Sequence, residues 1–196
     1  MARKREFNSL DVIDSSIDVF LSKGFEAAGI KDIVEATNVH PGSLYNTFGN
    51  KKEIIKGALK RFSEVSQFNL TLADAEKAQP RAAIEKLFYD LIETSEKRGS
   101  VGKCLLSNAA MELGGVDKGV TALLNEVFSE SEDLLCRLIE RGQEAGEISS
   151  QRPARHLAQF LANTVQGMQL MARFDSDKEK LRAIASMALE TLDQSQ

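Results

Sequence analysis

Residues 33–53, IVEATNVHPGSLYNTFGNKKE, predict the end of one helix, a sharp turn, a short second helix and the start of a third. Asn38 tolerates a left-handed backbone and can therefore end the first helix abruptly. Pro41 suits the first position of the second helix, where its missing N–H costs nothing. Gly49 can then end that helix after about two turns. The stretch thus predicts a helix-turn-helix.

The short helix over residues 41–48 has an apolar side and a polar side. Leu44 and Phe48 are four residues apart, so they share one face and can enter a core. The other side chains are small, polar or aromatic and carry no net charge. A helix of this kind lets its backbone approach DNA closely while its side chains donate and accept at base edges. These side chains are Gly42, Ser43, Tyr45, Asn46 and Thr47.

The third helix begins with an unusual concentration of positive charge. Asn50 and Glu53 have the spacing of a capping box, which places Lys51 and Lys52 in the first turn. Cations there oppose the helix macrodipole, whereas a bound phosphate would reverse the balance. Lys31, near the start of the preceding helix, fits the same interpretation. The alternative is that each lysine is a solvated surface charge.

This region resembles the TetR/AcrR family of bacterial transcriptional regulators, whose pattern is I-A-x-x-A-G-V-S-x-G-x-L-Y-x-H-F-x-x-K-E-x-L. The resemblance rests on Ile33, Val34, Ala36, Val39, Gly42, Leu44, Tyr45, Phe48, Lys51 and Ile54. It implies that Tyr45, Thr47, Lys51 and Lys31 contact phosphates, while bases are read by the small and polar side chains of the short helix. The full predicted DNA-contact set is Lys31, His40, Pro41, Gly42, Ser43, Tyr45, Asn46, Thr47 and Lys51.

The sequence also departs from the family pattern at four positions. Ala28 and Gly29 stand where the family usually has hydroxyls that cap the helix and touch phosphate, so Lys31 is expected to carry more of that contact. His40 replaces the usual Ser or Thr cap, and Thr47 replaces a common histidine. Both replacements keep hydrogen-bonding capacity. They predict a contact set that cannot be transferred from relatives.

The composition is that of an ordinary soluble protein of 196 residues, 28% charged and 42% hydrophobic. The formal net charge is −4, but residues 1–60 contain nine Lys and Arg against eight Asp and Glu, so the amino-terminal part is slightly basic. Residues 3–5 form a basic arm that could reach DNA or remain a solvated tail. No apolar run approaches the ~20 residues of a membrane span, and no secretion signal is evident. We therefore expect a cytoplasmic protein without membrane association.

Helical periodicity continues along the whole chain, and no strand is expected. The apolar positions predict an all-α fold of about nine helices, with a helix-turn-helix domain over residues 6–66 and a larger helical domain over residues 67–196. In the first helix, we expect Leu10, Ile13 and Phe20 to share the buried face. The predicted helices are 9–23, the two on either side of the sharp turn, 50–70, 80–98, 102–113, 117–145, one opened by Pro153, and 177–192.

The larger domain is expected to bind an effector and to form a homodimer. One short helix reads only a few base pairs, so a two-fold partner is needed to read the two halves of a pseudo-palindromic operator. The resemblance implies that the last two helices pair with those of a second subunit and that the middle helices enclose a small, hydrophobic or electrophilic effector. The alternative for each candidate pocket residue is plain core, which is the usual role of apolar side chains at helical spacing. The candidates are Phe88, Tyr89, Cys104, Leu105, Met111, Phe128, Phe160, Met168 and Met171.

The two cysteines differ in their expected reactivity. Cys104 lies at the predicted start of a short helix beside Lys103, and both features favour the reactive thiolate. The alternative is a small apolar residue under that helix. Cys136 lies about 140° from the apolar stripe of its helix, at ~100° per residue, and is assigned no role. The spacing of these cysteines with His40 and His156 does not suggest a metal site.

Enzymatic activity is not expected from the sequence. We find no nucleophile–base pair, no phosphate-binding glycine loop and no carboxylate–histidine cluster, and we expect neither a cofactor nor a metal. The other alternative is a helical protein-interaction adaptor that has lost DNA binding. The acidic net charge and the missing hydroxyls at Ala28 and Gly29 keep that alternative open, and salt-dependent, sequence-selective DNA binding would exclude it.

Overall fold

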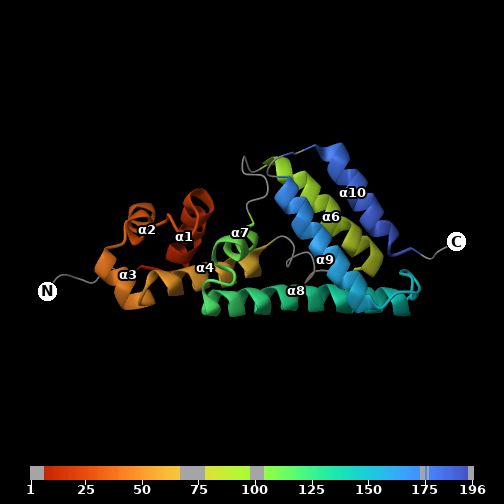
Figure 1. Ribbon diagram of the computed structural model, residues 1–196, viewed down its shortest axis with the longest axis horizontal. Coiled ribbons are helices and arrows are strands. Elements are labelled where there is room, and N and C mark those ends of the chain that lie inside the picture. Colours follow the sequence, from red (N-terminus) through yellow and green to blue (C-terminus); the bar gives the residue numbers. More distant parts are fainter. Residues whose placement is uncertain (1–6, 67–77, 98–103, 173–174, 176, 194–196) are drawn as a thin grey trace. The chain divides into compact units, whose positions relative to one another are not determined.

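The computed structural model describes residues 7–66, 78–97, 104–172, 175 and 177–193. Within these ranges the chain forms nine helices and no strand, which confirms the predicted all-α fold (Figure 1). Each helix in these ranges is too short or too polar to span a lipid bilayer. The helices are α1 Ser9–Lys23, α2 Ile30–Thr37, α3 Pro41–Phe48, α4 Lys51–Val65, α6 Pro80–Lys97, α7 Leu105–Leu113, α8 Lys118–Glu144, α9 Ala154–Met171 and α10 Lys178–Glu190.

Contacts between residues divide the chain into two compact units. Unit 1 comprises Met1–Glu64 and Leu105–Asn125, and unit 2 comprises Val65–Cys104 and Glu126–Gln196. The first segment of unit 1 ends close to the boundary predicted at residue 66. However, α7 and the first part of α8 also belong to unit 1, although the sequence assigns them to the larger domain. The helix-turn-helix therefore has additional structural neighbours that lie far from it in the sequence.

The core of unit 1 is formed around α1. Ile13 and Phe20 are buried as predicted, and the Phe20 ring stacks on that of Phe25, with the ring centroids 5.1 Å apart. The prediction for Leu10 was wrong, because this side chain is 53% exposed. Instead the buried face includes Ser16, whose hydroxyl donates a hydrogen bond to the carbonyl of Val12 at 2.7 Å. A back-bonded serine satisfies its own polarity, which explains why it can replace an aliphatic side chain there.

A glycine allows α1 and α4 to approach each other closely within unit 1. A Cβ atom added to Gly57 would lie only 2.7 Å from Cδ1 of Ile13. Any larger residue would therefore push these helices apart or force Ile13 out of its position. Because α4 follows directly after α3, this contact fixes the position of α4 against α1.

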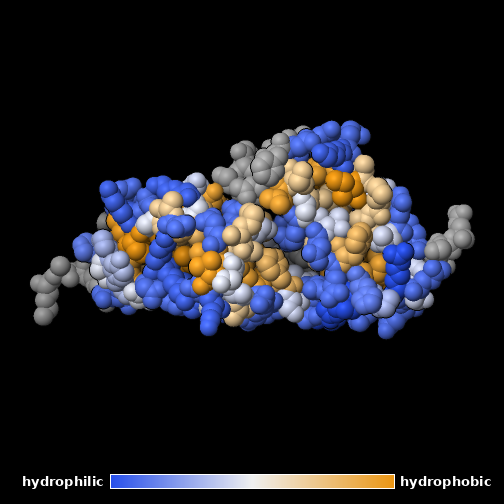
Figure 2. All heavy atoms as spheres, in the orientation of Figure 1, coloured by the Kyte–Doolittle hydropathy of each residue, from blue (hydrophilic) through white to orange (hydrophobic). Residues whose placement is uncertain are grey.

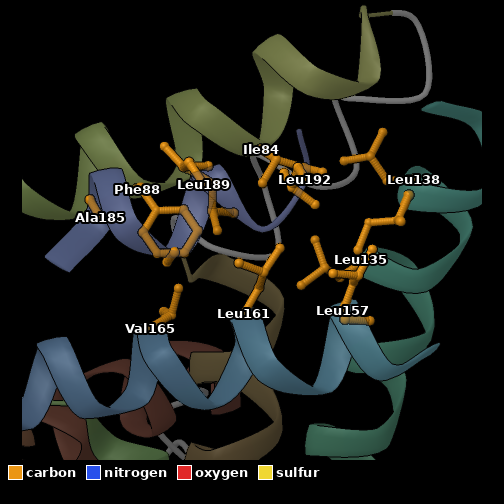
Figure 3. Close-up of a cluster of buried hydrophobic side chains, with 14 of the residues drawn as sticks. Ile84, Phe88, Leu135, Leu138, Leu157, Leu161, Val165, Ala185, Leu189 and Leu192 are labelled. Atoms are coloured by element: carbon orange, nitrogen blue, oxygen red, sulfur yellow. The ribbon is translucent and has the colours of Figure 1, made fainter. Parts of the chain in front are cut away.

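The core of unit 2 is built from α6, the second part of α8, α9 and α10. Figure 3 shows leucines, isoleucine, valine and phenylalanine from these four helices pointing toward one another. Phe88 from α6 and Leu161 from α9 are both fully buried in this cluster. Ala158 and Ala188 are also part of it. These two alanines are therefore used for packing inside the unit.

Cys136 also belongs to this core, so its predicted position away from the apolar side of α8 was wrong. Its side chain is 3% exposed. The first part of α8 belongs to unit 1 and the second part to unit 2, so the helix contributes to two different cores. The buried face of the second part therefore differs from the apolar face that the first part predicts. Burial raises the pKa of the Cys136 thiol, with a further contribution from the neighbouring carboxylate of Glu140.

Candidate nucleic-acid interface

The turn between α2 and α3 has the geometry that the sequence predicts. Asn38 adopts the left-handed conformation, with φ 55° and ψ 27°, and its N–H donates to the carbonyl of Val34 at 2.8 Å. Pro41 is the first residue of α3. The imidazole Nδ1 of His40 accepts a hydrogen bond from the N–H of Gly42 at 3.2 Å, so His40 is the N-cap of α3. The histidine thus performs the capping role that a hydroxyl usually has at this position.

α3 is attached to the rest of unit 1 through one fully buried side chain. Leu44 is 1% exposed, and Phe48 is half-buried. The opposite side of the helix is open to solvent, as expected for a surface that meets a ligand. Tyr45 is 51% exposed, and Ser43 is half-buried. The remaining exposed residues of this face are Pro41, Gly42, Asn46 and Thr47.

The first turn of α4 contains two lysines with different partners. Lys51 Nζ donates to the backbone carbonyl of Glu26 at 3.3 Å and forms no ion pair with a carboxylate in the part of the chain that the structure describes. Lys52 Nζ lies 2.7 Å from Oδ2 of Asp117, so this charge is neutralised within unit 1. Asn50 Oδ1 accepts a hydrogen bond from the N–H of Glu53, which is one half of the predicted capping box. Of the two lysines, Lys51 is therefore the one whose charge is not already paired with Asp117.

The start of α2 has no side-chain N-cap, and a carboxylate in its first turn binds back to the N–H of the N-cap residue instead. Asp32 Oδ2 accepts a hydrogen bond from the N–H of Gly29 at 2.6 Å, and Asp32 also pairs with Lys23. The hydrogen bonds from Lys23 and from Gly29 keep the pKa of Asp32 below its ordinary value. Its contribution to stability is therefore present at neutral pH and is lost as the pH falls through that lowered pKa.

Lys31 remains available at the same helix end. Its side chain is 88% exposed, and its nearest carboxylate, that of Glu35, lies 3.9 Å from Nζ and is itself exposed. An exposed pair at this separation contributes little and is easily exchanged for another anion. The surface of unit 1 therefore combines an exposed, uncharged face on α3 with lysines at the starts of α2 and α4. Among the described residues, no cluster of His, Cys, Asp and Glu could hold a metal ion.

Comparison with known proteins identifies the family. Residues 12–58 match the family described as bacterial regulatory proteins, tetR family. Residues 80–188, more than half of the chain, match the family described as Tetracyclin repressor-like, C-terminal domain. The chain belongs to the TetR family. It is a DNA-binding transcriptional regulator, and the adaptor alternative is not favoured.

Relatives in this family cover nearly the whole chain. The HTH-type transcriptional repressor DhaR from Mycobacterium sp. (strain GP1) is 28% identical over 183 residues, which are 92% of this chain and 90% of that protein. The HTH-type transcriptional repressor ComR from Escherichia coli (strain K12) is 26% identical over 189 residues, 95% of this chain and 90% of that protein. The aligned segments therefore include residues of both units.

Solved structures show the same fold. A cysteine mutant of the TetR family regulator CifR, in complex with a 26-bp double-strand operator DNA, has a TM-score of 0.82 and 24% identity, covering 97% of this chain and all of that chain. The reduced form of E. coli NemR has a TM-score of 0.84 and 17% identity, covering 94% of this chain and 97% of that chain. At these identities the likeness establishes the architecture.

The predicted effector residues are distributed over both units. Leu105 and Met111 belong to α7 in unit 1, and Cys104 directly precedes that helix. Phe88 and Met168 are buried in the core of unit 2, and Phe128 is half-buried on α8. Large parts of Tyr89, Met111, Phe160 and Met171 are exposed to solvent. A pocket built from this whole set stays a prediction.

Two carboxylates of unit 1 were missed in the sequence. Glu112 accepts hydrogen bonds from the backbone of Phe25 and Glu26, and Asp117 pairs with Lys52. The only local signal is at Asp117, which precedes a long amphipathic stretch and caps α8. Glu112 lies within α7 and shows no capping or motif spacing. Its role depends on a contact across 87 residues, which no local pattern reveals.

Proposed function

We propose that this TetR-family chain is a repressor that binds a pseudo-palindromic operator as a homodimer and releases it in response to an effector. The observation that supports this most directly is the exposed, uncharged face of α3, which is held by a capped turn and one buried leucine. Its length suits a major groove, and its polar side chains suit base edges. Selection of bound duplexes from a random library tests the proposal, and an enriched inverted repeat is the expected result.

Individual side chains of unit 1 have different expected effects on operator binding. Lys51→Ala removes a phosphate contact, so the slope of log K against log salt should fall by about one and affinity should fall equally on all sequences. Tyr45→Phe should also weaken binding without changing preference. Asn46→Ala should instead relax the preference at one base pair by about 1–3 kcal/mol. The measurement is a titration of each variant with operators that differ at single positions.

The contact set predicted for α3 and α4 is rejected if all three variants keep the affinity and preference of the wild type. Lys52→Ala is the matched control for Lys51→Ala, because it changes the same kind of residue in the same turn. Since Lys52 is already paired with Asp117, its loss should leave the salt dependence of binding unchanged. An equal change in slope for both lysines would show that the pairing does not distinguish them.

The homodimer is supported by exposed apolar and small residues on α9 and α10. Figure 2 shows hydrophobic side chains at the surface over this end of unit 2. Met187 is 71% exposed, Phe160 and Leu170 are exposed to a smaller extent, and Gly167 faces open space. An exposed apolar surface on two adjacent helices is typical of a subunit interface. We propose that this surface packs against its copy in the second subunit.

The effector is proposed to be a small hydrophobic or electrophilic molecule. Two routes of response are considered, namely occupation of a site among the helices of unit 2 and modification of Cys104. The second route is favoured by one observation. Cys104 is half-exposed and immediately precedes α7, so a dissolved oxidant or electrophile can reach its sulfur, whereas Cys136 is buried. The cytoplasm, where the operator lies, would be the site of either response.

Oxidation of Cys104 is expected to release the operator. Hydrogen peroxide takes two electrons from the thiolate, which becomes a sulfenic acid, while the peroxide is reduced to water or hydroxide. Operator binding by the wild type should fall after mild peroxide treatment and return with dithiothreitol. Cys104→Ser should bind operator but ignore peroxide. Cys136→Ser is the control. The Cys136 thiol is buried and its pKa is raised, so it should react little with peroxide, and Cys136→Ser should respond to peroxide like the wild type.

The opposite result has a clear meaning for the effector. If Cys104→Ser loses the operator after peroxide to the same extent as the wild type, Cys104 is not the sensor. If peroxide does not change operator binding by the wild type, a non-covalent ligand in unit 2 becomes the better hypothesis. In that case, fluorescence or thermal-shift screening with small hydrophobic compounds would follow.

A further inference from the structure

The segment that joins α7 to α8 makes polar contacts with the helix-turn-helix of unit 1. We call residues 112–120 the elbow. Glu112 Oε2 accepts a hydrogen bond from the N–H of Phe25 at 2.7 Å and a second from the N–H of Glu26 at 3.2 Å. The two N–H groups lie in the turn between α1 and α2. One carboxylate therefore binds two consecutive backbone donors, which orients that turn.

The same turn is held from its other side by α4. The carbonyl of Glu26 accepts the hydrogen bond from Lys51 Nζ, so the backbone of this residue is bound both by Glu112 and by Lys51. The turn also needs a glycine. Gly24 has φ +83°, and a Cβ atom there would lie 3.2 Å from both carboxylate oxygens of Glu112. The backbone and the carboxylate thus fit each other closely.

A second contact joins the elbow to the first turn of α4. Asp117 Oδ1 accepts hydrogen bonds from the N–H groups of Gly119 and Val120, both at 2.9 Å, and so caps α8. Its other oxygen, Oδ2, pairs with Lys52 at 2.7 Å. A Cβ atom on Gly119 would lie 3.4 Å from Cε of Lys52 and of Lys56. α4 and the start of α8 therefore touch at this point.

We propose that Glu112 and Asp117 are positioning residues for DNA binding, which hold the α1–α2 turn and the first turn of α4 in the arrangement that meets the phosphates. The proposal rests on the proposed function of the α3 surface. The two segments contain or lead directly into Lys51 and Lys31, the expected phosphate ligands. Asp117 also neutralises Lys52, which leaves Lys51 as the unneutralised cation of the α4 first turn.

These contacts differ from those that only stabilise the fold. Glu112 is exposed and Asp117 is half-buried, so neither removes much apolar surface from water. If the Glu112 carboxylate is lost, water can hydrate the N–H of the exposed Glu26, whereas the N–H of the buried Phe25 loses its acceptor. One lost acceptor is a small part of the stability of the unit, which can therefore remain folded. What changes is where the turn lies relative to α4. A displacement of about 1 Å is enough to break a phosphate hydrogen bond.

The experiment compares operator affinity for four variants of the full-length protein, using the operator selected by the wild type. Glu112→Met removes both acceptor oxygens, whereas Glu112→Gln keeps one. Asp117→Asn keeps an N-cap of similar quality but loses the charge that pairs with Lys52. Glu126→Met is the control, because Glu126 is an exposed carboxylate on α8 with no hydrogen bond or ion pair among the described residues. Fluorescence anisotropy is measured at a temperature where circular dichroism shows every variant to be folded.

We expect Glu112→Met to weaken operator binding about tenfold, as for the loss of a charged hydrogen-bond acceptor, and Glu112→Gln to restore most of it. Asp117→Asn should weaken binding about threefold, and Glu126→Met should have no effect. Hydrogen exchange of the Phe25 and Glu26 amides should accelerate in Glu112→Met only.

Several outcomes would overturn the proposal. If Glu112→Met accelerates exchange at Phe25 and Glu26 but binds operator like the wild type, the contact exists without positioning DNA binding. If the affinity loss disappears after correction for the unfolded fraction, the residue is merely structural. If Glu112→Met fails to fold, Glu112→Gln and Asp117→Asn decide, and unchanged affinity in both rejects the inference. A wild type without any operator contradicts the proposed function itself, and the inference with it.

Discussion

Leu44→Ala is expected to release α3 from unit 1 and to lower the stability of that unit by about 2–4 kcal/mol. Leu44 is the one residue of α3 that is fully buried, at 1% exposure. Truncation of a buried leucine leaves a cavity, and a helix of eight residues cannot compensate by its own stability. Operator affinity should therefore fall by more than tenfold even where the remainder of the chain is intact.

Hydrogen exchange followed by mass spectrometry can separate the two units in this experiment. Peptides from α2, α3 and α4 should lose protection in Leu44→Ala, whereas peptides from α9 and α10 should keep that of the wild type, because they belong to the core of unit 2. Two controls are available. Leu44→Met conserves volume and should cost less than about 1.5 kcal/mol. Leu10→Ala removes a largely exposed leucine and should be nearly neutral.

Retention of wild-type protection in α3 together with wild-type operator affinity would contradict the expectation for Leu44. It would mean that α3 is held mainly by its caps. These are the His40 side chain at its start and the N–H of Gly49, which donates to the carbonyl of Tyr45, at its end. Caps are worth about 1 kcal/mol each, so they should not suffice alone.

The helix-turn-helix could be predicted because its determinants are local. Asn38 and Gly49 adopt positive φ angles, which their residue types tolerate. Pro41 is the first residue of α3, a position at which the missing N–H of proline costs no hydrogen bond. Each of these features depends only on the backbone of adjacent residues. The prediction of Leu10 as core failed because a helical pattern fixes the apolar arc but not which edge of that arc is covered.

The contacts of the elbow could not be predicted for a different reason. Glu112 and Phe25 are separated by 87 residues, and nothing in the spacing of either segment indicates the other. Cys136 shows the same limit, because α8 serves two cores and its apolar stripe therefore changes direction along its length. Long-range packing decides both cases, and it overrides the local periodicity.

Met187→Asp is expected to convert the protein to a monomer and to weaken operator binding about 100-fold or more. Met187 is the most exposed large apolar residue of α10, at 71%. A carboxylate at this position would have to lose its hydration in an apolar interface. If the two-fold axis of the dimer passes near residue 187, the carboxylate would also face the identical carboxylate of the second subunit and be repelled by it. Two linked reading helices gain affinity from effective concentration by factors of about 10²–10⁴, and a monomer loses that gain.

Light scattering and anisotropy at matched concentrations measure these two effects of Met187→Asp. Met187→Leu is the matched control, because it keeps an apolar side chain at the same position and should remain dimeric with wild-type affinity. Met187→Asp should still bind a single half-site weakly with the same base preference, since α3 and the residues that hold it lie in unit 1. A dimeric Met187→Asp with unchanged operator affinity would place the subunit interface elsewhere. In that case Phe160→Asp on α9 would test whether the interface is confined to the other helix.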